Sequence, residues 1–117
     1  GCLNTLPHFE HTMQRANLTS VVKTVVGDSP VIAGTWKEQI GMLFIDGGHG
    51  REVARNDYVA WTPHVAVGGT LAIHDVFSDP ALGGQAPYEE IYLAAINSKN
   101  FVETSCTGSL RILQRVK

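Results

Sequence analysis

One stretch of the chain decides the fold, and from Met42 to Phe77 it reads MLFIDGGHGREVARNDYVAWTPHVAVGGTLAIHDVF. It holds two short, mainly apolar runs, Met42–Ile45 and Thr70–Ile73, and each gives way at once to polar residues. Apolar runs without alternation are typical of strands covered on both faces, as in a parallel sheet. The segment between them, Arg51–Val65, has an apolar stripe at helical spacing. A strand, a helix and a second strand in this order predict a parallel pair.

Outward from this unit, helices and strands continue to alternate. We expect helices over Leu6–Ala16 and Val31–Glu38, a further helix from Pro87, and strands over Val21–Val26, Phe101–Cys106 and Leu110–Val116. The last two strands flank Thr107-Gly108-Ser109, a typical hairpin turn. The order predicts one α/β domain with a mostly parallel sheet, helices on both faces and a C-terminal antiparallel hairpin.

Composition narrows the classes of partner. The chain has 117 residues and a formal net charge of −2, and it contains no run of Lys or Arg. A nucleic-acid partner and an anionic membrane surface are therefore not expected. No apolar stretch reaches the length of a membrane-spanning helix. The two widely spaced cysteines, Cys2 and Cys106, predict free thiols in the reducing cytoplasm.

Three polar residues follow the two central strands. Asp46 comes after the first, and His74 and Asp75 after the second. Because function in such sheets sits at the carboxyl ends of the strands, we expect these side chains to converge there. Two carboxylates and an imidazole can hold Mg²⁺, Ca²⁺ or Mn²⁺. The alternative is that Asp46 caps the next helix and His74-Asp75 only forms a turn.

Further candidates lie at the same edge. His49 follows two glycines and is either a general base or a residue that solvates the turn. Asp28 and Ser29 follow the Val21–Val26 strand, and they either contact a base or ribose or cap the following helix.

The stretch from residue 43 to residue 77 resembles the class I S-adenosylmethionine-dependent methyltransferases. It is similar to a small-molecule group with a D-G-x-H motif after the fourth strand and a G-G-x-(apolar)-H-D motif at the fifth. The likeness extends to GDS at 27–29, GGQAPYE at 83–89 and TGSLRIL at 107–113. It implies O- or N-methyl transfer to a small molecule on a partial Rossmann-like methyltransferase fold.

The resemblance also implies roles for the residues. Asp28 and Ser29 would contact the adenine side of S-adenosylmethionine. Asp46 would lie beside the methyl-transfer centre and, with His74 and Asp75, would hold Mg²⁺ or Mn²⁺. His74 departs from the carboxylate usual in metal-dependent relatives. His49 would be the base or a substrate contact.

The family's first strand, glycine-rich loop and second strand have no counterpart in residues 1–117. The resemblance therefore implies the C-terminal part of such a fold, truncated and impaired in cofactor binding. The alternatives are a non-catalytic methyltransferase-like fragment or interaction module, and a small divalent-metal-binding protein.

We also expect a homodimer, because the strand at Met42–Ile45 would otherwise expose an unpaired edge. Either Val21–Val26 of the same chain pairs with that edge, or the N-terminal helix and strand dock onto a second copy.

Overall fold

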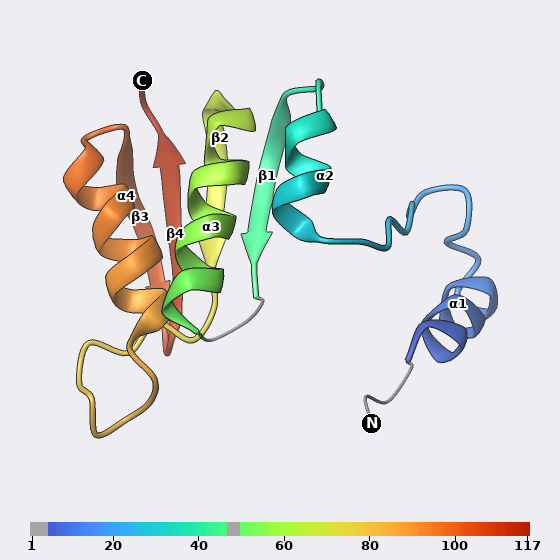
Figure 1. Ribbon diagram of the computed structural model, residues 1–117, viewed down its shortest axis with the longest axis horizontal. Helices are drawn as coiled ribbons and strands as arrows, with labels where there is room; N and C mark the ends of the chain where they lie inside the picture. The colour runs from blue at the N-terminus through green and yellow to red at the C-terminus, as the bar shows by residue number, and fades with distance from the viewer. Residues whose placement is uncertain (1–4, 47–49) are drawn as a thin grey trace.

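The computed structural model describes residues 5–46 and 50–117, and Figure 1 shows their arrangement. The elements are α1 (Leu6–Arg15), α2 (Ser29–Thr35), β1 (Ile40–Ile45), α3 (Arg51–Trp61), the 3₁₀ helix η1 (Thr62–His64), β2 (Val65–Ile73), the π-helix η2 (Pro87–Tyr92), α4 (Leu93–Ser98), β3 (Phe101–Thr107) and β4 (Leu110–Arg115). None of the helices in this part of the chain is long and apolar enough to cross a membrane.

The four strands form one mixed sheet in the order β1-β2-β4-β3. β1 and β2 run parallel, as the strand–helix–strand pattern predicts, whereas β4 is antiparallel to both of its neighbours. The partial Rossmann-like α/β fold and the C-terminal hairpin are confirmed. The sheet has a smaller parallel part than the sequence suggested, because the third expected parallel strand does not form.

The core lies between one face of the sheet and a layer made by α2, α3 and the continuous η2–α4 helix (Figure 1). Leu71, Ile73 and Leu113 are fully buried there. The helix that begins at Pro87 buries the stripe the sequence predicted, with Ile91 and Ala95 inside the core. The prediction of helices on both faces is wrong for the described residues. The second face of the sheet is open, and Met42, Phe44 and Val102 expose much of their surface on it.

The connection from α3 into β2 differs from the prediction at both ends. The α-helix ends at Trp61 because Pro63 lacks an amide hydrogen, and β2 already begins at Val65. Gly68 and Gly69 therefore lie inside a strand, where they form an irregularity in the pairing with β1. Gly68 has φ +87°, and a Cβ on Gly69 would meet the Ala66 carbonyl oxygen at 2.8 Å.

The predicted strand at Val21–Val26 is wrong. These residues lack regular strand structure, and all six are exposed. β-branched side chains favour strands when they pack on a pleated surface, and here no neighbouring strand is provided. Residues 5–28 instead form an arm that leads away from the sheet and ends in α1, a helix without a buried residue (Figure 1). The expected pairing of Val21–Val26 with β1 of the same chain is therefore absent from the described structure.

Cross-strand packing of Leu71 against Leu113 should dominate the stability of the sheet. Both are completely buried, and they are partners in the β2–β4 register. We expect Leu71→Ala to lower the free energy of unfolding by about 2–5 kcal/mol, since it leaves a cavity. The matched control Val67→Ala, at an exposed position of the same strand, should cost only about 0.5 kcal/mol. Urea unfolding measures both, and equal losses would contradict this account of the core.

Candidate functional site

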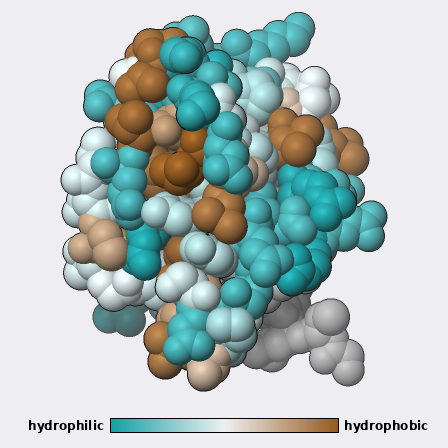
Figure 2. Space-filling view, turned by 90° about the vertical axis from the view of Figure 1, so that its left-hand side faces the viewer, coloured by the Kyte–Doolittle hydropathy of each residue, from teal (hydrophilic) through white to brown (hydrophobic). Residues whose placement is uncertain are grey.

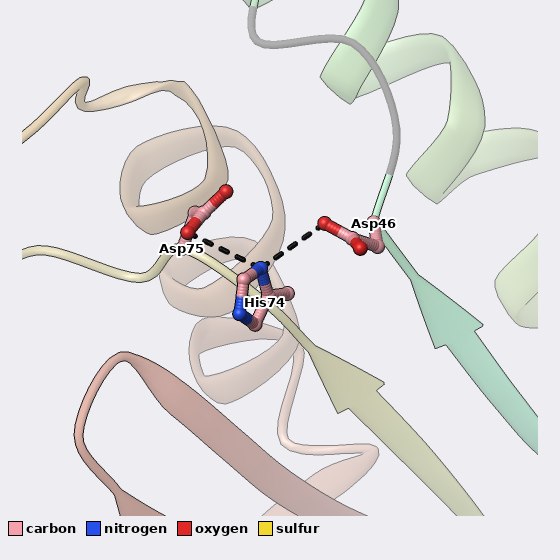
Figure 3. A group of neighbouring side chains, drawn as sticks. All are labelled: Asp46, His74 and Asp75. Atoms are coloured by element: carbon pink, nitrogen blue, oxygen red, sulfur yellow. Dashed lines mark hydrogen bonds and ion pairs between the residues drawn. The ribbon is translucent and has the colours of Figure 1, made fainter.

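The carboxyl ends of β1 and β2 bring together Asp46, His74 and Asp75 (Figure 3). The Nδ1 atom of His74 lies 3.1 Å from Oδ1 of Asp46 and 3.2 Å from Oδ1 of Asp75. One ligand atom from each residue lies within 4.8 Å of the other two. The convergence predicted from sequence is observed, and the imidazole lies between the two carboxylates.

The backbone holds this arrangement at three points. The His74 amide donates to the Ile45 carbonyl at 3.2 Å, which extends the parallel pairing past the end of β2. Asp75 has φ +59°, a conformation that is uncommon for residues other than glycine. The Val76 amide then donates to Ser109 in the β3–β4 turn. Backbone strain of this kind concentrates at functional sites.

Asp46 does not cap α3, because the N-cap of that helix is Gly50. Its carboxylate instead contacts His74. Asp28 occupies the N-cap position of α2, but its side chain makes no capping hydrogen bond. The alternative in which Asp46 caps the next helix is therefore wrong, whereas Asp28 occupies a cap position without using its side chain.

A cleft of about 600 Å³ lies between α2, α3 and the end of β1. Asp28 and Ser29 line it together with Asp46. Leu43 and Ile45 contribute apolar surface. The remaining lining residues are Pro30, Phe44, Val53, Asn56, Asp57 and Trp61. Thus Asp28 and Ser29 share one cleft with Asp46, which also belongs to the group in Figure 3.

Two side-chain hydrogen bonds fasten α2 to the end of α3. The indole Nε1 of Trp61 donates to the Ser29 hydroxyl at 2.7 Å, and Nε2 of His64 lies 2.9 Å from the Ala33 carbonyl oxygen. Trp36 packs edge-on against Trp61, with ring centroids 5.6 Å apart. These contacts fix the first turn of α2 at the rim of the cleft.

Among the residues singled out from sequence, Asp46, His74 and Asp75 meet, and Asp28 and Ser29 share the cleft with Asp46. His49 lies outside the described residues. The sequence reasoning missed Asp57 and Trp61, which both line the cleft. Asp57 and Trp61 are four residues apart on one helix and therefore lie on the same face. This spacing could have predicted from the sequence that both side chains face the same cleft.

The arginines of α3 are engaged in ion pairs with η2. Arg51 bonds to Glu89, and Arg55 makes two 3.0 Å hydrogen bonds to Glu90. The hydrogen bonds from Arg55 lower the pKa of the Glu90 carboxyl and raise the pKa of Arg55. Hydrogen bonding to Glu89 likewise raises the pKa of Arg51. These cations thus tie helices together beside the cleft.

Comparison with known families identifies the chain. The family described as a methyltransferase domain matches residues 2–76, which is more than half of the sequence and includes every residue of the cleft. The fold and this match define a Rossmann-like α/β protein. The chain belongs to the methyltransferase-domain family.

Solved structures with this fold include the methyltransferase MycE from the mycinamycin biosynthetic pathway, in complex with Mg, SAH and mycinamycin VI. It is 22% identical with a TM-score of 0.57, over 80% of this chain and 31% of that one. An rRNA methylase from Streptococcus thermophilus is 16% identical with a TM-score of 0.58, over 95% and 69% of the two chains. This chain thus spans about a third of the length of MycE. At these identities the likeness shows the fold.

The Trp61–Ser29 hydrogen bond should hold the first turn of α2 in place. Trp61→Phe keeps an aromatic ring and removes the indole donor, so we expect faster hydrogen exchange of the Ile32 amide, which bonds to the Asp28 carbonyl. The control Trp36→Phe leaves the Trp61–Ser29 bond intact and should leave that rate nearly unchanged. Equal exchange rates in both variants would contradict the clamp.

Proposed function

We propose that this chain contributes the adenine-side and metal-side residues of an S-adenosylmethionine-dependent O- or N-methyltransferase that acts on a small molecule. The observation that carries the proposal is the single cleft that runs from Asp28 and Ser29 to Asp46, beside His74 and Asp75. Its position at the carboxyl ends of parallel strands is the usual position of a ligand in this type of sheet.

Each residue then has a role that its position supports. The Asp28 carboxylate would accept hydrogen bonds from the adenosine part of the ligand, and Ser29 lines the same cleft. Asp46, which also lines the cleft, would stabilise the positive charge of the sulfonium. When bound, S-adenosylmethionine supplies an electrophilic methyl group. His49 is proposed as the base that takes the proton of the acceptor's hydroxyl or amine.

The group at Asp46, His74 and Asp75 fits a divalent cation. Ligand atoms on adjacent corners of an octahedral Mg²⁺ site, at about 2.1 Å from the ion, lie about 3 Å apart. The two separations from His74 Nδ1 are 3.1 and 3.2 Å. Two carboxylates suit Mg²⁺, and the imidazole makes Mn²⁺ at least as suitable. Such an ion would hold the acceptor oxygen or nitrogen close to the cleft.

The charge of the cleft favours a small acceptor over RNA. Among the residues that line it are Asp28, Asp46 and Asp57, and no Lys or Arg is among them. The nearby Arg51 and Arg55 are paired with glutamates. A polyanionic backbone would be repelled at this rim. The solved structures of this fold include both a methyltransferase from the mycinamycin pathway and an rRNA methylase, so the fold does not distinguish the two kinds of acceptor. The proposal of a small acceptor therefore rests on the charge of the cleft alone.

Residues 1–117 by themselves are proposed to bind S-adenosylmethionine weakly, because they hold no counterpart of the glycine-rich loop that the resemblance assigns to the cofactor. We further propose a homodimer in the cytoplasm, where the exposed Cys106 stays reduced. A second candidate function is a small metal-binding protein, favoured by the three-residue group alone. A non-catalytic interaction module would be favoured if neither ligand bound.

Removing one carboxylate should weaken the metal site. We expect Asp46→Asn to reduce Mn²⁺ affinity at least tenfold, since a hard cation loses a charged oxygen ligand. The control Glu10→Gln removes an exposed carboxylate on α1 and should leave affinity unchanged. Electron paramagnetic resonance of free Mn²⁺ gives both values. Equal affinities in the two variants, or no binding by the unmodified chain, would exclude this metal site.

Millimolar S-adenosylhomocysteine should perturb the amide resonances of Asp28, Ser29 and Asp46 in ¹H–¹⁵N spectra. Adenosine should shift the first two as well, whereas methionine should leave them in place. Asp28→Ala should weaken binding several-fold, because an acceptor for the adenosine part is lost, and Glu10→Ala should not. Shifts confined to other regions would contradict the proposed cleft. Micromolar affinity in a demonstrated monomer would contradict the proposal of weak binding.

A further inference from the structure

One of the three side chains of the candidate metal site offers nitrogen instead of oxygen. Within residues 5–46 and 50–117, Asp46, His74 and Asp75 are the one group of three or more side chains that could hold a metal ion. The two aspartates offer carboxylate oxygens, and His74 offers an imidazole nitrogen. Because divalent cations differ widely in their affinity for imidazole, this one residue bears on which ion the group binds best.

The nitrogen lies in the middle of the group. Nδ1 of His74 is 3.1 Å from Oδ1 of Asp46 and 3.2 Å from Oδ1 of Asp75, and both carboxylates point toward the ring (Figure 3). An ion bound by both carboxylates would therefore lie beside the ring nitrogen. The imidazole is thus placed as a ligand of the same ion, in a position that an all-oxygen site would give to a third oxygen.

The backbone brings the nitrogen and one of the oxygens to the same side. Adjacent side chains of an extended strand point to opposite faces, so two consecutive residues do not normally share a ligand. Asp75 departs from the extended conformation, with φ +59°, and its carboxylate lies beside the His74 ring. Hydrogen bonds from the His74 and Val76 amides fix the chain on both sides of this turn.

A neighbouring aromatic ring restrains the imidazole from another direction. The ring of Phe44, on β1, packs edge-on against the ring of His74, with centroids 6.3 Å apart and planes at 74°. Edge-to-face contacts of this kind favour one relative orientation of the two rings. The observed orientation is the one in which Nδ1 faces Asp46 and Asp75.

This set of ligands does not suit all divalent cations equally. Mg²⁺ is a hard ion that prefers carboxylates and water, and it gains little from an imidazole. Fe²⁺, Co²⁺ and Zn²⁺ bind imidazole well, and they also accept carboxylate ligands. Mn²⁺ lies between these two groups of ions. The single nitrogen therefore favours the transition-metal ions, while the two carboxylates balance the charge of any divalent cation.

We propose that His74 makes this centre selective for divalent transition-metal ions over Mg²⁺. The inference rests on the metal site proposed above and narrows the ion that the site holds. In this account His74 is the residue that determines selectivity, whereas Asp46 and Asp75 contribute affinity for every divalent cation.

Exchanging the nitrogen for oxygen tests the selectivity. His74→Asp should lower the affinity for Co²⁺ at least tenfold, because the imidazole ligand is lost. The affinity for Mg²⁺ should stay the same or rise, because a third carboxylate replaces a neutral group. The visible absorption of bound Co²⁺ gives the first affinity, and displacement of Mn²⁺, followed by electron paramagnetic resonance, gives the second.

The control variant is His11→Asp, which makes the same exchange at an exposed position of α1. Hydrophilic residues are spread over the face of the molecule shown in Figure 2, so weak binding at scattered surface groups has to be subtracted. All proteins carry Cys2→Ser and Cys106→Ser, which removes the thiols as ligands of Co²⁺. The control should keep the Co²⁺ and Mg²⁺ affinities of its parent.

Proton resonances of a Co²⁺-bound imidazole give a second readout that does not depend on affinity. The parent should show strongly shifted ring resonances that persist in His11→Asp and disappear in His74→Asp. An unchanged ratio of Co²⁺ to Mg²⁺ affinity in His74→Asp, or bound Co²⁺ without these resonances, would overturn the selectivity and leave the metal site standing. Failure of the parent to bind either ion would overturn both.

Discussion

The parallel pairing of β1 with β2 is the constraint on which the rest of the structure depends. It aligns Phe44 with Ala72 and Ile45 with Ile73, so both strands end at the same level. The hydrogen bond from the His74 amide to the Ile45 carbonyl continues this alignment by one residue. As a result, Asp46 and His74, which are 28 residues apart in sequence, reach hydrogen-bond distance, and Asp75 lies on the other side of the imidazole. An antiparallel pairing would have placed them at opposite ends of the sheet.

The same pairing requires a crossover, and α3 provides it. Its length and its end before Pro63 determine where Trp61 and His64 lie, and these two side chains hold α2 in place. The cleft is the space left between α2, α3 and the end of β1. These contacts between helices therefore shape the proposed ligand site, and they also set the direction in which the arm leaves the body of the protein.

Strong local patterns gave correct predictions of the elements. The apolar runs before Asp46 and His74, the stripe after Pro87 and the hairpin around Gly108 are all observed. The predictions failed where tertiary context decides. The valines of residues 21–26 have strand propensity without a partner strand, and Gly68-Gly69 accommodates a pairing irregularity inside β2 instead of a turn before it. Neither outcome can be read from a single segment, because both depend on what the neighbouring strand provides.

The sequence by itself determined the family, the order of the elements and which polar residues follow the two central strands, because these depend on local periodicity and motif. Only the tertiary structure decided that the His74 ring lies between Asp46 and Asp75, that Trp61 ties down Ser29, and that Asp57 lines the cleft. It also decided that α1 buries none of its residues within the described part of the chain. The physical reason is that distances between side chains are set by the register of the sheet and the packing of helices upon it. Register and packing are both determined by many contacts between residues far apart in the sequence, and a local sequence pattern does not contain that information.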